Sequence, residues 1–272
     1  HATEIYLGSP TKRLLASDET FYRFLKENVL SLAKKNDLIF AVSDGVYESL
    51  VEAGIEHEKI VKNYNGVDAD YWLNRSKEIL PQPRPVAFYQ GNINQRLDFE
   101  LIFGVCKALP DWDFWFCGKE SASSPLWADI TNLNNVSSYG YCELAEIAKK
   151  AQSCTVGLVP FKNSHALYTS MPLKMYEYVA CGLPVVSIPI KDLLHYDKNI
   201  FWFVETVAEF KMAMEELYKA GSRANVKSLK QRKRISLLNS YDVKFDSSLQ
   251  KICKKAHLKT GCINKRNGRI FR

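Results

Sequence analysis

The sequence predicts an α/β fold in which a parallel β-sheet carries helices on both of its faces. Short apolar segments of strand length alternate with segments of helical periodicity along most of the 272 residues. This alternation is typical of parallel sheets, because a helical crossover joins each strand to the next. A polar stretch with Pro81, Pro83 and Pro85 interrupts the pattern and is the best candidate for a linker.

Two helices and two strands are predicted before the linker. Ser17 or Asp18 can cap the first helix. Its apolar face consists of Phe21, Phe24, Leu25, Val29 and Leu32. Strands at residues 37–42 and 59–63 then flank a helix at residues 44–53.

After the linker the pattern predicts six strands and six helices. The strands are expected at residues 86–90, 113–117, 136–138, 154–159, 184–189 and 200–204. The helices are expected at residues 97–109, 143–151, 172–181, 207–220, 226–238 and 243–257. Loops are expected around residues 121–125 and over residues 162–171. Ligands of such open sheets bind beyond the carboxyl ends of the strands, so loop 162–171 and the residues after Gln90 are expected to meet at one site.

The composition is that of an ordinary globular protein, with 46% apolar and 25% charged residues. No apolar run approaches the roughly 18 residues that a membrane-spanning helix needs. The seven cysteines form no Cys-x-x-Cys pair and lie mostly in apolar segments. Buried, reduced thiols show this pattern, so we expect a cytoplasmic protein without a disulfide framework or a zinc site.

The net charge of +7 is concentrated near the C-terminal end, where residues 251–272 contain eight cations and no acidic residue. A second basic cluster precedes them and consists of Lys227, Lys230, Arg232, Lys233 and Arg234. Solvated faces are the first expectation, and peripheral contact with an anionic membrane at its inner face is the second. Nucleic acid is not expected, because the aromatic residues are not interleaved with the cations as a base-stacking surface requires.

The helix predicted at residues 172–181 carries a lysine where helix electrostatics disfavour one. Pro172 suits the first helical position, but Lys174 in the first turn opposes the helix dipole. A bound anion would account for this lysine, because the free N–H groups and the ammonium would share it. Glu177, one turn later, could accept hydrogen bonds from two hydroxyl groups. The alternative is a surface pair of Lys174 and Glu177.

Four segments together resemble a known family. Residues 172–186, Pro-Leu-Lys-Met-Tyr-Glu-Tyr-Val-Ala-Cys-Gly-Leu-Pro-Val-Val, resemble the donor-site helix of the GT-B glycosyltransferases, specifically the retaining family numbered 4. Three further segments resemble this family in the same order: Phe40-Ala41-Val42-Ser43, Asn65-Gly66-Val67-Asp68 and Gly91-Asn92-Ile93-Asn94-Gln95-Arg96-Leu97-Asp98. The resemblance extends over residues 20–245.

The resemblance implies an enzyme that moves a sugar from a nucleotide-diphosphate sugar, of UDP or GDP type, to a hydroxyl of a glycan or lipid-linked acceptor. Retention of anomeric configuration is implied, without a metal or cofactor. Two facing Rossmann-like domains are also implied. Residues 1–80 would be the C-terminal part of the acceptor domain with the linker, residues 81–240 the donor domain, and residues 241–272 a closing helix and basic tail. Most of the acceptor domain would then be missing. The alternative is a non-catalytic nucleotide- or sugar-binding module of a larger assembly.

The residues that match the family's donor site are expected to bind the nucleotide sugar. Lys174 and Arg96 are candidates for stabilising the diphosphate leaving group, which needs cations where its charge develops. Gly91 lets the backbone approach the phosphates. By resemblance, Glu177 holds the ribose hydroxyls and residues 139–141 face the base. The expected donor-binding residues are Gly91, Asn92, Arg96, Tyr141, Lys174 and Glu177.

Alternatives remain for single residues. Gly91 could form an ordinary tight turn, and Arg96 could pair on the surface with Asp98 or Glu100. No further catalytic residue is identified.

The chain departs from the family's pattern at several positions. Thr169 stands where the family has a second glutamate that contacts the sugar, and Tyr64 stands where a proline usually precedes the Asn-Gly-Val-Asp segment. Among the histidines, His57, His165 and His195 do not match the family's N-domain histidine.

Two acidic pairs could hold a divalent cation. Asp111 and Asp113 enter a predicted strand rather than leave it, so they are expected at the edge opposite the site. Asp68 and Asp70 belong to the turn at the domain junction. No metal site is therefore expected.

Two helices carry apolar stripes that we expect to be buried. The first stripe consists of Leu173, Tyr176 and Ala180, and it is expected to pack on the sheet. The second consists of Phe245, Leu249, Ile252 and Ala256. By resemblance, the second helix crosses back onto the acceptor domain, and residues 259–272 trail from it as a cationic arm.

Overall fold

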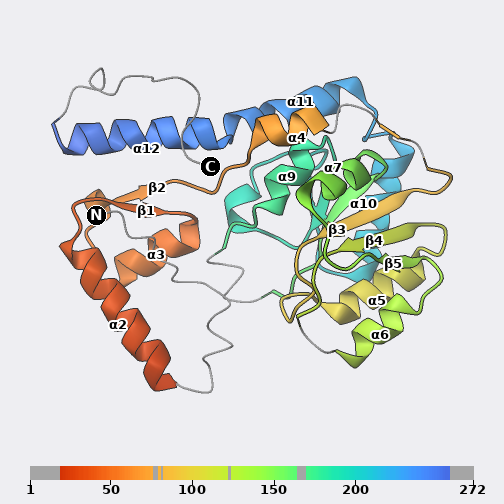
Figure 1. Cartoon of the computed structure of the whole chain (residues 1–272), viewed down its shortest axis with the longest axis horizontal. Coiled ribbons are helices and arrows are strands. Elements are labelled where there is room, and N and C mark those ends of the chain that lie inside the picture. The colour runs from red at the N-terminus through yellow and green to blue at the C-terminus, as the bar shows by residue number, and fades with distance from the viewer. Residues whose placement is uncertain (1–18, 76–78, 81, 122–123, 164–169, 258–272) are drawn as a thin grey trace.

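The computed structural model describes residues 19–75, 79–80, 82–121, 124–163 and 170–257. These residues form two parallel sheets, one of six strands and one of two strands. Figure 1 shows the two sheets side by side in separate units, which we call the large unit and the small unit. The α/β fold class predicted from the alternating pattern is confirmed.

The large unit is built on a six-stranded sheet with the strand order β5-β4-β3-β6-β7-β8. Its strands are β3 (Val86–Gln90), β4 (Asp113–Cys117), β5 (Val136–Ser138), β6 (Val156–Val159), β7 (Val185–Ser187) and β8 (Phe201–Phe203). Each neighbouring pair is parallel. Every residue of β3 and β6 is buried, as expected of central strands covered on both faces. The six predicted strands are confirmed, and their ends differ from the prediction by two residues at most.

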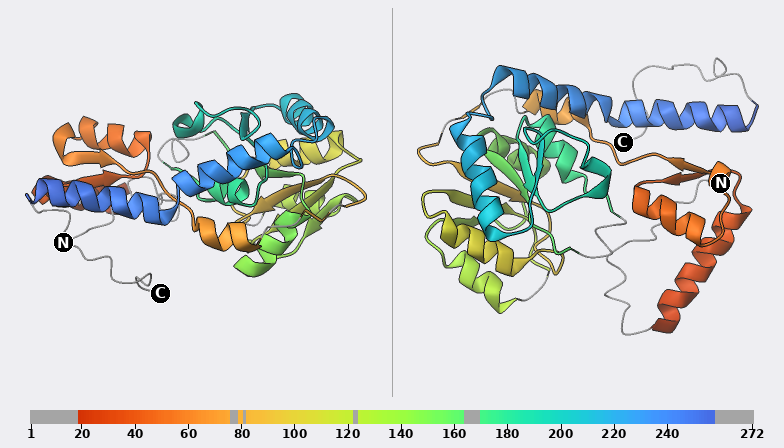
Figure 2. Two further views of the ribbon diagram at one scale, coloured as in Figure 1. Left: turned by 90° about the horizontal axis from the view of Figure 1, so that it is seen from above. Right: turned by 180° about the vertical axis from the view of Figure 1, so that it is seen from behind.

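Helices cover both faces of this sheet (Figure 2). One group of packed helices consists of α5 (Phe99–Ala108), α6 (Pro125–Thr131) and α10 (Val207–Lys219). The other group consists of α4 (Ala69–Arg75), α7 (Leu144–Gln152), α9 (Lys174–Ala180) and α11 (Val226–Leu238). Polar side chains fix several of their N-termini. Asp98, for example, accepts a hydrogen bond from the backbone N–H of Leu101 at 3.0 Å and so begins α5.

The small unit has its own hydrophobic core. Its elements are α2 (Glu19–Lys35), β1 (Ile39–Ala41), α3 (Asp44–Glu52), the short 3₁₀ turn η1 (His57–Lys59) and β2 (Ile60–Lys62). Its core consists of Ala33, Ile39, Ala41, Val46, Leu50, Ile55 and Ile60. The long helix α12 (Tyr241–Lys255) leaves the large unit and runs along the small unit (Figure 1). There the Asn63 amide donates a hydrogen bond to the Ser248 hydroxyl at 2.8 Å.

Two helices of the large unit, α4 and α6, are not predicted by the sequence pattern. Each has seven residues, too few to show a clear helical period. Trp72 and Trp127 anchor them in the large core, with 3% and 4% of their surfaces exposed. Residues 69–75 therefore pack with the large unit although they precede the proline-rich linker. The proposed domain boundaries remain a prediction.

The burial predicted for two apolar stripes is only partly correct. In α9 the stripe residues Tyr176 and Ala180 are buried, but Leu173 lies before the helix and is 42% exposed. In α12 the stripe prediction is wrong, because Phe245 is 50% exposed and Ile252 is 44% exposed. The side of α12 that bonds the segment after β2 carries Ser248 instead.

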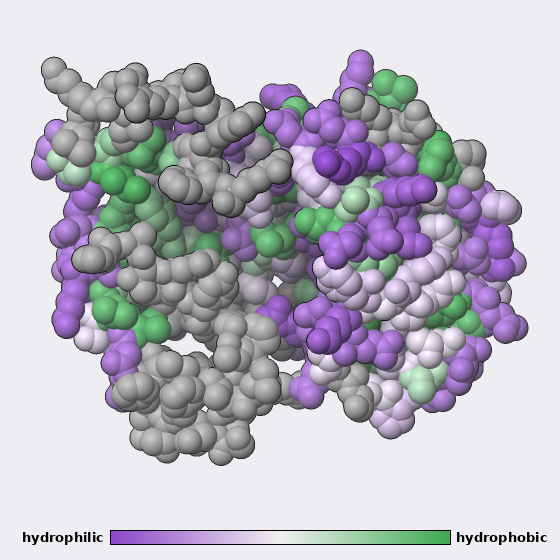
Figure 3. Space-filling model, in the orientation of Figure 1, coloured by the Kyte–Doolittle hydropathy of each residue, from purple (hydrophilic) through white to green (hydrophobic). Residues whose placement is uncertain are grey.

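The molecular surface differs between the two units. Figure 3 shows a mainly hydrophilic face on the large unit, whereas hydrophobic residues gather over the small unit and the helix beside it. Leu32, predicted to lie on the apolar face of the first helix, is 44% exposed there. No helix within the described ranges is both long enough and apolar enough to cross a membrane. The predicted cationic arm, residues 259–272, lies outside the described residues.

Two arginines, Arg223 and Arg232, are buried between α10, α11 and the sheet. The guanidinium of Arg223 donates to the carbonyls of Ala151, Cys154 and Cys181 at 3.3, 3.2 and 2.7 Å. Arg232 has no exposed surface and donates to the carbonyls of Asn199 and Ser222. Its assignment to a solvated basic cluster is therefore wrong. Burial lowers the pKa of both groups. The bond from Arg223 to Cys181 satisfies a carbonyl that the C-terminal end of α9 leaves open.

We expect Arg223→Ala to lower the free energy of unfolding by about 2–4 kcal/mol, because three hydrogen bonds to buried backbone carbonyls are lost. Urea denaturation followed by circular dichroism measures this loss. Arg234, which is exposed on α11, provides the control. Its replacement by alanine should change stability by less than about 0.5 kcal/mol. Equal effects of the two substitutions would show that the Arg223 bonds do not stabilise the fold.

Candidate functional site

The carboxyl edge of the large sheet brings several loops into contact. The residue after β3 is Gly91, whose backbone N–H donates to the carbonyl of Cys117 at the end of β4, at 2.8 Å. Next to it, the N–H of Gly118 donates to the carbonyl of Gly140 at 2.7 Å. Three connections that follow neighbouring strands therefore lie against one another at this edge.

Glycine is required at two of these positions. Gly91 has a φ of +124°, and a Cβ atom there would lie 2.5 Å from the Nζ atom of Lys174. A Cβ atom at Gly118 would lie 1.9 Å from the carbonyl oxygen of Gly91. The turn predicted at Gly91 thus serves a purpose beyond reversing the chain, because it leaves space for a cationic side chain from α9.

Lys174 reaches from α9 to the end of β3. Its Nζ atom donates to the hydroxyl of Tyr89 at 3.0 Å. The same atom lies 4.1 Å from the ring centroid of Tyr89 and 5.0 Å from that of Phe161. The pKa of Lys174 is lowered to about 7, chiefly by burial; the carboxylate of Glu177 raises it, and the charge of Arg96 contributes to the lowering. A second anion at this position would restore the charged form of the lysine.

Glu177 lies one turn further along α9 and also contacts β3. Its carboxylate accepts a hydrogen bond from the side-chain amide of Gln90 at 2.6 Å. Burial raises the pKa of Glu177 to about 6, against the effect of Lys174. The alternative of a surface Lys–Glu pair is wrong, because both side chains are partly buried and bond residues of β3.

Arg96 lies in the segment between β3 and α5 and has an incompletely satisfied guanidinium. Its Nε atom is buried without a hydrogen-bond partner, and burial lowers the pKa of the group. The predicted alternative of a pair with Asp98 is not observed, since the Asp98 carboxylate caps α5. A buried, unsatisfied donor next to a buried ammonium is an arrangement that an anion would stabilise.

The other two predicted residues lie at the rim of the site. Asn92 is exposed, and its carbonyl accepts a hydrogen bond from the Tyr89 hydroxyl at 3.1 Å. Tyr141 is 70% exposed and belongs to the loop after β5. In the same loop Tyr139 contacts Trp115 edge to face, with ring centroids 5.9 Å apart. This loop therefore presents aromatic surface beside Gly118.

Several residues of the site are not identified from the sequence. Tyr89 and Gln90 belong to a strand that the sequence predicts to be buried throughout. Tyr178 is predicted to be an ordinary core residue. Its hydroxyl accepts a hydrogen bond from the backbone N–H of Gln90 at 2.8 Å and so fixes α9 on β3. Phe161 gives no signal of its own. Only the polar Gln90 at the end of an apolar run could have indicated a role.

The acidic pairs and histidines considered in the sequence lie elsewhere. Asp113 is the first residue of β4, at the amino edge, and pairs with the Arg84 Nε atom at 3.3 Å. His57 contacts Glu58, and His195 lies on the ring of Tyr196. The described ranges contain no group of three or more His, Cys, Asp or Glu side chains that could hold a metal ion. The positions of His165 and Thr169 lie outside the described residues.

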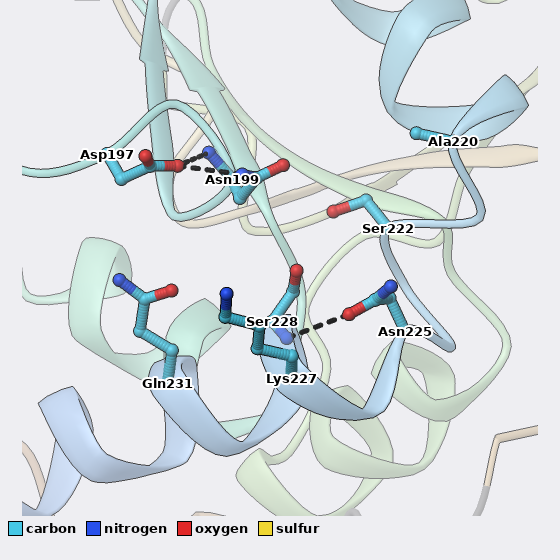
Figure 4. A pocket seen from close by; sticks show the side chains of 8 residues that line it. All are labelled: Asp197, Asn199, Ala220, Ser222, Asn225, Lys227, Ser228 and Gln231. Carbon is cyan, nitrogen blue, oxygen red and sulfur yellow. Dashed lines mark hydrogen bonds between the residues drawn. The ribbon is translucent and has the colours of Figure 1, made fainter.

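A pocket with a volume of 460 Å³ lies at the amino edge of the sheet (Figure 4). It is lined by Asp197, Asn199, Ala220, Ser222, Asn225, Lys227, Ser228 and Gln231. Figure 4 shows Asp197 accepting hydrogen bonds from the backbone and side-chain N–H groups of Asn199, at 2.7 and 2.8 Å. None of the predicted donor-binding residues lines this pocket, so it is separate from the site at the carboxyl edge.

Comparison with known proteins identifies the family. A family model described as "Glycosyl transferases group 1" matches residues 85–220, which include β3, Gly91, Arg96 and the whole of α9. The chain belongs to this family.

One curated relative is TuaH of Bacillus subtilis (strain 168), which is named as a teichuronic acid biosynthesis glycosyltransferase. It is 25% identical over 198 residues, which are 67% of this chain and 48% of TuaH. The family member described here thus spans about half the length of that curated relative.

Solved structures of glycosyltransferases share the fold. The structure of Alr3699/HepE of Anabaena in complex with UDP-glucose has a TM-score of 0.68 at 14% identity, over 87% of this chain and 69% of that chain. A glycosyltransferase from Rickettsia africae ESF-5 has a TM-score of 0.65 at 15% identity, over 88% of this chain and 67% of that chain. These similarities confirm the predicted GT-B fold.

We expect Lys174→Met to raise the free energy of unfolding near pH 7, because it removes the cost of burying an ammonium. The folded-state pKa is about 7, against an ordinary value of 10.5. Below the folded pKa both the folded and the unfolded chain are charged, and the full cost applies. Above the unfolded pKa both are neutral, and the cost vanishes. The stability gained by the substitution should therefore be largest near pH 7 and shrink as the pH rises to 10.

Urea denaturation of the parent and the variant at pH 7 and pH 10 measures this difference. Lys162→Met is the control, since Lys162 is exposed, and it should change the free energy of unfolding by less than about 0.5 kcal/mol. If Lys174→Met raises the free energy of unfolding by the same amount at both pH values, Lys174 is not buried with a lowered pKa.

Proposed function

We propose that the carboxyl edge of the large unit binds a nucleotide-diphosphate sugar, and that the whole protein transfers the sugar to an acceptor hydroxyl. The observation that carries this proposal is the partly buried Lys174 ammonium, which lies against Gly91 and within electrostatic reach of Arg96, whose Nε atom is buried without a partner. Two cationic groups without a carboxylate hydrogen-bonded to them fit a ligand that brings its own negative charge.

The diphosphate would lie along Gly91, where no side chain blocks the backbone. Lys174 and Arg96 would donate to its oxygens and stabilise the charge that develops on the leaving group. Because the pKa of Lys174 in the protein without ligand is about 7, diphosphate binding would shift the lysine to its charged form. Binding at pH 8 would therefore take up a proton, whereas binding at pH 6 would take up much less.

The nucleoside would extend from the phosphates toward α9 and the rim. Glu177 lies one turn from Lys174 and would accept hydrogen bonds from the ribose hydroxyls, with Gln90 holding its carboxylate in place. Asn92 and Tyr141 would border the ligand, and the loop of residues 139–141 would face the base. A UDP or GDP donor fits this arrangement, and the complex of Alr3699/HepE with UDP-glucose supports uridine as the first base to test.

The finer features of the reaction are proposals from the family resemblance. We propose the retaining family numbered 4, with net retention of anomeric configuration. Transfer is proposed to need no metal. Lys174 and Arg96 would supply the positive charge that a metal ion could otherwise supply to the diphosphate, and the Asp111–Asp113 pair lies near the amino edge. Glycan or lipid-linked acceptors are proposed, and the name of TuaH supports a role in glycan biosynthesis. We further propose a cytoplasmic protein with peripheral contact at an anionic membrane.

We expect Lys174→Ala to weaken UDP binding roughly 10-fold or more at pH 6.5, and uridine binding little, because one charge-assisted contact contributes roughly 1.5–3 kcal/mol. Isothermal titration calorimetry measures both affinities, and GDP with guanosine replaces the pair if uridine does not bind. Lys162→Ala is the matched control on the exposed surface. Equal losses for the nucleotide and the nucleoside would contradict a phosphate contact.

The same titrations run with EDTA test the proposal about metals. Affinity that falls in EDTA and returns with Mn²⁺ or Mg²⁺ would overturn metal independence without affecting the assignment of Lys174.

We expect Glu177→Ala to weaken uridine binding, and to weaken binding of 2′,3′-dideoxyuridine much less, because the lost acceptor serves the ribose hydroxyls. Competition against UDP measures both ligands. Glu120→Ala, which removes an exposed carboxylate near the same edge, should leave both affinities unchanged. If the Glu177 variant loses equal affinity for both nucleosides, the carboxylate does not bind the ribose hydroxyls.

A further inference from the structure

The segment that joins β2 to α4 contacts most of the elements around it. The backbone N–H of Asn63 donates to the carbonyl of Ala41 in β1 at 2.8 Å. The Tyr64 hydroxyl donates to the carboxylate of Asp44, at the start of α3, at 2.7 Å. The N–H of Val67 donates to the carbonyl of Asn239, between α11 and α12, at 3.0 Å. Both ends of this segment are therefore fixed, one by the small unit and one by the large unit.

Asn65, in the middle of this segment, reaches the donor helix. Its side-chain amide donates to the carbonyl of Met171 at 2.8 Å, across 106 positions of the sequence. Met171 is 2% exposed and lies three residues before Lys174. The side chain thus bonds the chain just upstream of the helix that carries both Lys174 and Glu177.

The Met171 carbonyl lies just outside the helix that it precedes. α9 has Leu173 as its N-cap, and the N–H of Glu177 donates to the carbonyl of Leu173 at 3.2 Å. The N–H of Met175 donates to the carbonyl of Pro172 at 3.2 Å, in a tight turn that leads into the helix. The backbone of α9 therefore does not bond the carbonyl of the buried Met171, and the Asn65 amide supplies a hydrogen bond to it.

We infer that Asn65 is a positioning residue for the nucleotide site, which it serves by fixing the start of α9 from the segment that joins the two units. As a statement about nucleotide affinity, this inference rests on the proposed function. The hydrogen bond from Asn65 couples the position of the small unit to the placement of Lys174 and Glu177. By linkage, a nucleotide that orders α9 must also favour the arrangement of the two units in which this bond is made.

Among the described residues, three other polar contacts between the units end away from α9. Asp192 accepts a hydrogen bond from the backbone N–H of Asp44 at 2.8 Å, and Lys191 pairs with Glu48 at 2.6 Å. The Asn63 amide donates to Ser248 of α12 at 2.8 Å. Asn63 and Asn65 thus lie in one segment, and the side-chain amide of each donates a hydrogen bond of 2.8 Å to a distant element. Of these two bonds, that of Asn65 ends just before α9, at Met171. Asn63→Ala is therefore a matched control for Asn65→Ala.

Hydrogen exchange tests the inference without any ligand. In Asn65→Ala, and in the isosteric Asn65→Asp that lacks the N–H donor, amides of residues 176–181 should exchange faster relative to those of β3. Asn63→Ala should leave this ratio unchanged. A general loss of stability would raise exchange in α9 and β3 together, so a variant with a lowered melting temperature still decides the question. An unchanged ratio in both Asn65 variants would overturn the positioning role.

Titration with UDP tests the consequence for binding. Both Asn65 variants should bind UDP about 3- to 10-fold more weakly, as expected from the loss of one hydrogen bond that orders the site, and uridine should weaken in parallel because Glu177 moves with Lys174. Asn63→Ala should bind as the parent does, and an equal loss in Asn63→Ala would show that unit docking in general, and not Asn65, sets the affinity. If the parent chain itself binds no nucleotide, the proposed function fails, while the exchange ratio still decides the role of Asn65.

Discussion

The placement of the Lys174 ammonium against Gly91 is the constraint on which the site depends. Removing a charged amine from water is costly. Among the described residues no carboxylate lies in ion-pair contact with Lys174, and the more distant Glu177 offsets the cost only in part. The fold accepts this arrangement because three features converge. Gly91 has no side chain at the contact point, Tyr89 accepts a hydrogen bond from the ammonium, and Phe161 covers it from another side. Groups that are buried at such an unfavourable free energy are typical of binding sites for charged ligands.

The rest of the large unit can be understood as support for this contact. Tyr178 binds the backbone of Gln90 and so fixes α9 on β3. Gly157 lies under the ring of Tyr178, where a Cβ atom would lie 2.6 Å from it. Arg223 bonds the carbonyl of Cys181 at the other end of α9, and Asn65 bonds the carbonyl before its start. Both ends and one face of a seven-residue helix are therefore held by side chains from distant parts of the chain.

The sequence predicts the sheet and the edge where the site lies, because alternating short apolar runs leave little choice of topology. It also predicts which segments meet, since Gly91 and α9 follow strands of one parallel sheet. The electrostatics of the site could not be predicted. Lys174 and Glu177 fall three apart, which suits a surface pair equally well, and only the structure shows that each bonds a different residue of β3. The orientation of α12 is also missed, because the apolar period does not show that Ser248 is the residue that bonds the segment after β2.

The pKa of Lys174, measured by NMR on protein labelled at the lysine Cε carbon, tests this account most directly. The signal is assigned by its loss in Lys174→Met. Without ligand, the titration should give a pKa of about 7, and saturating UDP, or GDP if uridine does not bind, should raise it. A pKa near the ordinary value of 10.5 that stays unmoved by both nucleotides would contradict the buried cation and the diphosphate site together.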